Sequence, residues 1–180
     1  MLFPAILVLE DGSVMEGIGF GSKQQSVGEI VFNTSMSGYQ EIITDPSYAK
    51  QIIAFTHPHI GNTGINDEDN ESDNIFASAI VIKDLPKNYS NWRANQSLES
   101  FLLSKNTIGI SNIDTRALTA KLREHGSLKA CIAPGGKESL SEANDALNQF
   151  RGLEGLDLAK EVSTKNSFSW KEGTWPNYQD

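Results

Sequence analysis

The fold is decided close to the N-terminus by residues 6–20, which read ILVLEDGSVMEGIGF. Two apolar runs, residues 6–9 and 14–20, flank the pair Asp11-Gly12. An Asp-Gly pair between such runs favours a tight hairpin turn, because both residues tolerate the positive φ angles that the turn requires. The stretch therefore predicts an antiparallel β-hairpin. We do not expect a signal peptide here, since acidic residues follow the first apolar run at once.

Further strands and helices follow the hairpin in a mixed order. β-Branched and aromatic residues indicate strands, and apolar residues at helical spacing indicate helices. The predicted strands are 29–34, 51–56, 75–83, 108–110 and 128–133, and the predicted helices are a short one from Pro46 and longer ones at 97–104, 114–123 and 139–150. Ser139 and Glu142 match a capping box for the last helix. The pattern predicts an α/β domain with more than one sheet layer.

Length and composition limit the functional classes. The chain has 180 residues and a formal net charge of -8, with 38% hydrophobic residues. We expect one domain with a terminal extension. An acidic chain repels phosphate backbones, so we expect no nucleic-acid partner. No stretch approaches the length of a membrane span. A single cysteine cannot form an intramolecular disulfide, which favours a reducing, cytoplasmic location.

Three patterns with apparent chemistry have simpler explanations. His57 and His59 could share a zinc ion only with a ligand from elsewhere in the chain, and no ligand motif frames them. The acidic run 67–73 lacks the Gly and Glu that a calcium loop needs at its sixth and twelfth positions. Cys131 lies in a predicted strand, so we expect a buried structural thiol. We therefore expect no metal site and no catalytic residue among these groups.

Residues 33–41, NTSMSGYQE, form a dense polar stretch directly after a predicted strand. Hydroxyl and amide groups suit a neutral polar ligand, and loops held by a rigid sheet often carry binding residues. A plain surface loop fits the same residues. The sequence pattern leaves both interpretations open.

Seven ordered stretches together resemble one known family, the small, glutamine-handling subunit of carbamoyl phosphate synthetase. The similarity extends over nearly the whole chain. The stretches are 28–41 (GEIVFNTSMSGYQE), 44–48 (TDPSY), 58–62 (PHIGN), 90–93 (SNWR), 113–119 (IDTRALT), 122–126 (LREHG) and 157–162 (DLAKEV).

The resemblance implies a subunit that hydrolyses glutamine and passes the ammonia to a large synthetase subunit. The large subunit would join ammonia to bicarbonate with ATP and Mg²⁺, and carbamoyl phosphate would feed arginine and pyrimidine synthesis. This chain would bind no cofactor itself. The family's fold implies a swivelling β/β/α three-layer domain with mixed sheets.

The resemblance also implies domain limits and site residues. Residues 1–152 would form the N-terminal domain, and residues 153–180 would form a linker to a class I glutaminase domain with a Cys-His-Glu triad. That domain is not in this sequence, which contains no Gly-x-Cys-x-Gly elbow. The chain would therefore be an inactive fragment. Ser47 would contact L-glutamine, and Ser35 and Met36 would lie near the ammonia passage.

Two other functions remain as alternatives. The chain could be a non-enzymatic scaffold that docks on the large subunit and shapes the glutaminase without touching substrate. It could also be a metal-dependent hydrolase that uses His57 and His59. A change in glutamine kinetics on mutation of Ser47 distinguishes substrate contact from the scaffold, and bound zinc would indicate the hydrolase.

Overall fold

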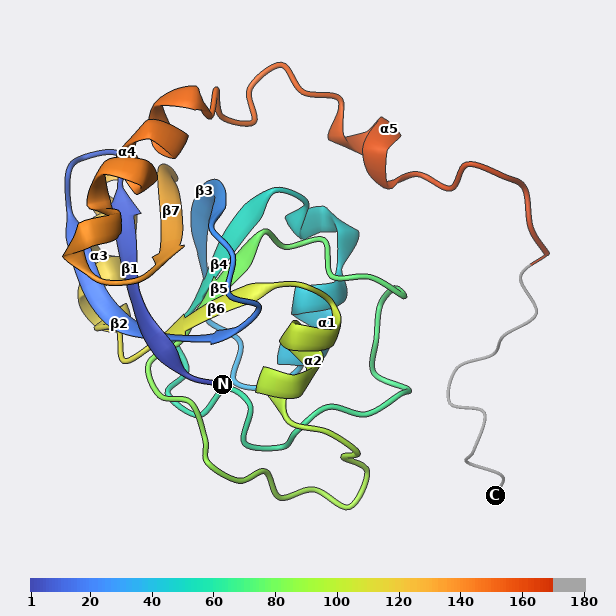
Figure 1. The fold of residues 1–180 in the computed structure, drawn as a ribbon. Helices are drawn as coiled ribbons and strands as arrows, with labels where there is room; N and C mark the ends of the chain where they lie inside the picture. The colour runs from blue at the N-terminus through green and yellow to red at the C-terminus, as the bar shows by residue number, and fades with distance from the viewer. Residues whose placement is uncertain (170–180) are drawn as a thin grey trace.

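A computed structural model describes residues 1–169 and shows strands closed into a barrel with helices around it (Figure 1). The strands are β1 (Phe3–Leu9), β2 (Val14–Gly21), β3 (Ser26–Asn33), β4 (Gln51–Phe55), β5 (Ala79–Val81), β6 (Ile108–Ser111) and β7 (Leu128–Pro134). Their order around the closed barrel is β1-β2-β6-β5-β4-β3-β7. The helices are α1 (Tyr39–Thr44), α2 (Leu98–Ser104), α3 (Thr115–His125), α4 (Leu140–Gln149) and α5 (Leu158–Val162), with short 3₁₀ helices η1 (Pro46–Tyr48) and η2 (Lys137–Ser139).

The barrel has a parallel arc and an antiparallel arc. Strands β3, β4, β5 and β6 run parallel to one another. Strands β1, β2 and β7 pair in antiparallel fashion and close the ring. Because parallel strands end at the same edge, the loops that follow β3, β4, β5 and β6 gather at one end of the barrel.

Alternating side chains fill the barrel and the layer outside it. One cluster contains Ala5, Leu7 and Ile52 from the strands together with Leu118 and Leu122 from α3, so α3 packs on the strand side chains of the interior. A second cluster joins the outer faces of β4 and β5 to α1 and α2. A third packs α4 on β1 and β7. Strands β1, β4, β5 and β6 are largely buried on both faces, which explains their nearly continuous apolar sequences.

The main elements predicted from sequence are present. The hairpin forms between β1 and β2, with Gly12 at a φ of 84° in its turn. Mixed α/β content and mixed strand directions are confirmed. The three-layer swivelling arrangement is not confirmed, because hydrogen bonds join the seven strands of residues 1–169 into a single closed barrel.

Three local predictions need correction. Ser139 and Glu142 do not form a capping box, because η2 already gives Ser139 helical backbone angles and its hydroxyl donates to the Pro134 carbonyl at 2.8 Å. The strand expected at 75–83 is limited to Ala79–Val81. The polar stretch 33–41 was expected to be a loop, but its last residues begin helix α1.

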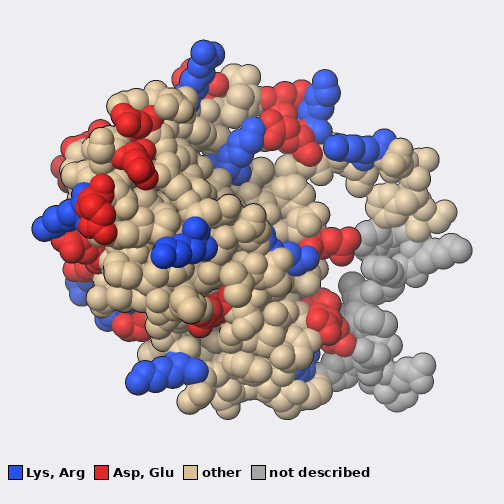
Figure 2. Space-filling model, in the orientation of Figure 1, with Lys and Arg blue, Asp and Glu red and all other residues tan. Residues whose placement is uncertain are grey.

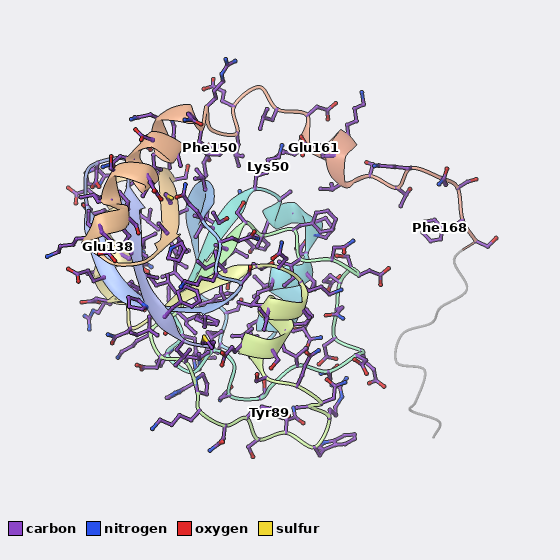
Figure 3. The ribbon with its side chains drawn as sticks, viewed as in Figure 1. Lys50, Tyr89, Glu138, Phe150, Glu161 and Phe168 are labelled. Atoms are coloured by element: carbon purple, nitrogen blue, oxygen red, sulfur yellow. The ribbon has the colours of Figure 1, made fainter. Side chains whose placement is uncertain are left out.

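Residues 153–169 extend away from the barrel, as Figure 1 shows, and polar groups tie part of this segment back to it. The Leu153 amide donates to Glu29 Oε1 at 2.8 Å. Lys50 Nζ lies 2.6 Å from Glu161 Oε1 of α5, and both side chains can be followed in Figure 3. The proposed boundary at 152/153 stays a prediction, and residues 170–180 of the predicted linker lie outside the described part. No helix within residues 1–169 has the length and apolarity needed to cross a bilayer.

Candidate functional site

Ser47 lies on a tight turn that fixes its backbone and leaves its side chain exposed. The Asp45 carboxylate accepts a hydrogen bond from the Ser47 amide at 2.8 Å, and Pro46 occupies the first helical position of η1. Proline fits there because no backbone donor is needed. Within residues 1–169, the Ser47 hydroxyl has no hydrogen-bond partner. It is therefore free to donate to, or accept from, an external group.

Asn33 connects this turn to the loop that carries Ser35 and Met36. Its Nδ2 donates to Tyr48 Oη at 2.9 Å, and its Oδ1 accepts from the Ser35 amide at 2.8 Å. Ser35 follows the end of β3, whereas Ser47 precedes the start of β4, so the two lie toward opposite edges of the parallel arc. The Asn33 side chain thus links the Ser35 loop at one edge of the parallel arc to the Ser47 turn at the other edge.

Helix α1 lies in the chain between these two segments, and the buried side-chain amide of Gln40 holds it in place. Gln40 is 4% exposed, and its Nε2 donates to the Asn66 carbonyl at 2.6 Å and to Asn70 Oδ1 at 2.8 Å. Its Oε1 accepts from the Asn66 amide at 3.0 Å. Burial raises the pKa of Tyr39, so its hydroxyl stays protonated and donates to the Gly64 carbonyl. The segment 34–48 therefore presents exposed groups from a rigid support.

The acidic run 67–73 has a structural role in this support. Arg93 binds both oxygens of Asp69, at 2.6 and 3.2 Å, and also contacts Glu68 at 2.9 Å. Asn66 Nδ2 donates to Asp69 Oδ2 at 2.7 Å. Desolvation raises the pKa of the nearby Glu41, with smaller contributions from neighbouring acidic groups. The run is therefore tied to Arg93 and, through Asn66, to Gln40.

The two histidines lie close to each other, but residues 1–169 contain no group of three His, Cys, Asp or Glu side chains that could hold a metal ion. The His57 and His59 rings are 5.6 Å apart and edge-to-face. The His59 amide donates to His57 Nδ1 at 3.3 Å, which leaves Nε2 as the nitrogen of that ring open to a ligand. The geometry gives the metal-dependent hydrolase no support.

Cys131 is a residue of β7 and is fully buried under α4, among Ile6, Val8 and Leu147. Burial raises its pKa to about 12. A thiol with this pKa is almost entirely protonated at neutral pH and cannot act as a nucleophile. Its prediction as a buried structural thiol is confirmed.

We expect the native chain to resist thiol reagents. At pH 8, a pKa of about 12 leaves roughly one thiolate in ten thousand, and the covering side chains block access. Reaction with a chromogenic disulfide should therefore be slow in buffer and complete within minutes after unfolding in urea. Stoichiometric labelling of the native chain at the unfolded rate would show that Cys131 is accessible.

An open groove of about 560 Å³ lies where β3 and β4 end. Thr34 and Thr56, the residues that directly follow these strands, contribute to its wall. The remaining lining comes from one face of α3: Arg116, Thr119, Ala120 and Arg123. No sequence motif marks this groove. The i, i+3, i+4, i+7 spacing of the α3 residues was visible, but its position opposite the strand ends required the fold.

Charged groups elsewhere on the surface alternate in sign. Figure 2 shows acidic and basic side chains interspersed over the visible face. Several of them form exposed ion pairs, such as Lys137 with Glu16 at 3.1 Å. The described surface on this face offers no continuous basic area of the kind that binds nucleic-acid backbones.

The family model and the relatives that match this chain in sequence name the same family. Residues 7–132 match the model of the family described as carbamoyl-phosphate synthase small chain, CPSase domain. The carbamoyl phosphate synthase small chains of Vibrio parahaemolyticus and Thioalkalivibrio sulfidiphilus are each 54% identical to this chain, over 95% and 96% of its length. That of Pseudomonas aeruginosa is 50% identical over 97% of its length.

The chain spans less than half of these relatives, 45% of the first two and 46% of the third. Among solved structures, a peptidase M28 precursor from Shewanella amazonensis matches 75% of this chain and 35% of its own, with a TM-score of 0.40 and 11% identity. Such a distant likeness does not bear on fold or activity. The family match and the small-chain relatives do: this chain belongs to the carbamoyl-phosphate synthase small chain family.

Proposed function

We propose that this chain is the N-terminal part of a small subunit that supplies ammonia from glutamine to the large subunit of a carbamoyl phosphate synthase. Its own contribution is to help bind glutamine and to dock on the large subunit. The match of residues 7–132 to the small-chain family carries this proposal. The free hydroxyl of Ser47, held on a rigid turn, is the group that we propose contacts L-glutamine.

The proposed domain layout follows the contacts of the C-terminal segment. Residues 1–152 form the domain, and residues 153–180 lead to a class I glutaminase domain that holds the catalytic triad. The Lys50–Glu161 ion pair supports this layout, because it brings α5 next to the segment that carries Ser47.

The remaining assignments follow from the same role. Ser35 and Met36, both exposed after β3, would lie near the ammonia passage. ATP and Mg²⁺ would act on the large subunit in a cytoplasmic heterodimer, and this domain would bind no cofactor. We also retain the swivelling β/β/α description as an expectation. The parallel and antiparallel arcs would be its two sheets and the outer helices its third layer.

The second candidate is a scaffold that docks on the large subunit without contacting substrate. The exposure of Met36 favours it, because 79% of this apolar residue is accessible to solvent. Single exposed apolar residues are common, but one at a loop tip next to a groove suits a protein contact. Both candidates share the subunit partner and differ in the role of Ser47.

Ser47→Ala in the complete small subunit should weaken glutamine use. Loss of one net hydrogen bond to a neutral ligand costs about 0.5–1.5 kcal/mol, which raises the KM for glutamine a few-fold to about tenfold. Ammonia-dependent synthesis should stay nearly unchanged. Steady-state kinetics of the assembled synthase with each nitrogen source measures both effects.

Ser37→Ala is the matched control, since Ser37 is also an exposed serine of the same segment. An unchanged glutamine KM in Ser47→Ala would favour the scaffold. A loss near a thousandfold would place Ser47 in the catalytic machinery. Equal damage to the ammonia-dependent reaction would indicate a docking or folding defect instead.

A further inference from the structure

We propose that Arg116 and Arg123 bind carboxylates of an acidic segment of the large subunit in the groove at the ends of β3 and β4. This inference rests on the proposed function, because it names the surface through which the domain docks. Nothing in the family match or the names of the relatives assigns a role to these two residues.

The arginines are free to bind a partner. No ion pair among residues 1–169 involves Arg116 or Arg123, although the chain contains 23 acidic residues. Both are exposed and both line the groove. Arg93, by contrast, is bound to Asp69 and Glu68. The protein is acidic overall, but these two unpaired guanidinium groups make one face of α3 locally positive. A positive surface of this kind favours an external anionic partner.

Their positions are fixed by the helix and by its neighbours. Leu118 and Leu122 anchor α3 in the interior cluster, which sets the direction of the opposite face. The Arg123 guanidinium carbon lies 5.8 Å from the centre of the Phe32 ring, so the ring face supports it. An arginine stacked in this way keeps its N–H edge available for bidentate bonds to a carboxylate. The binding groups are thus oriented before a partner arrives.

The spacing indicates more than one carboxylate. Seven residues of α-helix separate the two Cα atoms by about 10.5 Å. Thr34 and Thr56 on the facing wall add hydroxyl groups that can complete the hydrogen bonds. An open groove of about 560 Å³ gives a small oxyanion no enclosure, whereas an extended segment with acidic side chains would span both arginines.

The location identifies the source of that segment. Thr34 lines the groove and directly precedes Ser35 and Met36. If these residues border the passage through which ammonia leaves, the adjoining surface must face the subunit that receives it. Under the proposed function, the groove then adjoins the surface where the large subunit is expected, and charge complementarity with its two arginines favours acidic residues on that subunit.

The test is the affinity between the complete small subunit and the purified large subunit, measured at low and high salt. The double variant Arg116→Gln/Arg123→Gln should bind about tenfold more weakly for each arginine lost. Its affinity should depend less on salt than that of the wild type. Arg151→Gln is the matched control, because Arg151 is also exposed and lies outside the groove lining. It should bind like the wild type.

A double variant that binds within twofold of the wild type would overturn the proposal. The Arg116→Lys/Arg123→Lys variant keeps both charges and should lose less affinity than the glutamine pair; an equal loss would show that charge is not what the groove supplies. Titration with inorganic phosphate tests a small-anion site. Phosphate binding that the double variant abolishes, with subunit affinity unchanged, would replace the docking proposal. Wild-type protein that fails to bind the large subunit would instead contradict the proposed function.

Discussion

Residues 1–180 alone are expected to release no glutamate from glutamine above the uncatalysed rate. The glutamine hydrolysis that we propose for the complete subunit would need an activated nucleophile such as a thiolate, and the chain has one cysteine. That cysteine is Cys131, which is fully buried and has a pKa raised to about 12 by burial. A coupled assay for glutamate with the purified chain at micromolar concentration measures the rate. The expected effect is the complete absence of a catalysed reaction.

Cys131→Ala provides the control for this prediction. The substitution removes a buried sulfur but no catalytic group, so the background rate should be the same in both proteins. Glutamate release by the wild-type chain that disappears in Cys131→Ala would contradict the account, because Cys131 would then be a nucleophile in spite of its burial. Restoration of activity when the chain is joined to a glutaminase domain would agree with the proposed domain layout.

Gln40→Ala should cause a large loss of stability. Gln40 is 4% exposed and makes three hydrogen bonds to residues 66 and 70, two of them to backbone groups of Asn66. Removal leaves the Asn66 amide and carbonyl without these partners, at a cost of about 2–4 kcal/mol in the free energy of unfolding. Urea unfolding followed by circular dichroism measures the change.

The same substitution at Gln149 separates this effect from the loss of a glutamine as such. Gln149 is exposed at the end of α4, so Gln149→Ala should change stability by no more than about 0.5 kcal/mol. Comparable losses at the two positions would show that the buried network contributes little. Because α1 leads directly to the turn that holds Ser47, Gln40→Ala in the complete subunit should also lower the rate of glutamine-dependent synthesis more than the rate of ammonia-dependent synthesis.

The sequence predicted the positions of most strands, because buried strands produce apolar runs that stand out from the loops, but it made the strand at 75–83 too long. It missed α1 because the helix is short and its buried face includes Gln40 and Thr44. Such polar residues suggest a loop unless their hydrogen-bond partners are known. Those partners, the Asn66 backbone and Asn70, lie about 26 to 30 residues further along the chain.

The closed barrel and the groove depend on contacts that no local pattern contains. Closure requires β7 to pair with both β1 and β3, which are far from it in sequence. The groove requires the ends of β3 and β4 to face α3. Ser35, Met36 and Ser47 could be named from the resemblance to a family, but their connection through Asn33 could not. Side-chain contacts between separate segments follow from tertiary structure alone.

The most direct test of the central claim is the nitrogen source that the large subunit can use. Carbamoyl phosphate formation should be measured with purified large subunit, ATP, Mg²⁺ and bicarbonate, with and without the complete small subunit that carries these residues. Glutamine should support synthesis only when the small subunit is present, whereas ammonia should support it in both cases. Equal glutamine-dependent synthesis without the small subunit, or no gain on its addition, would contradict the claim that this chain belongs to the source of ammonia.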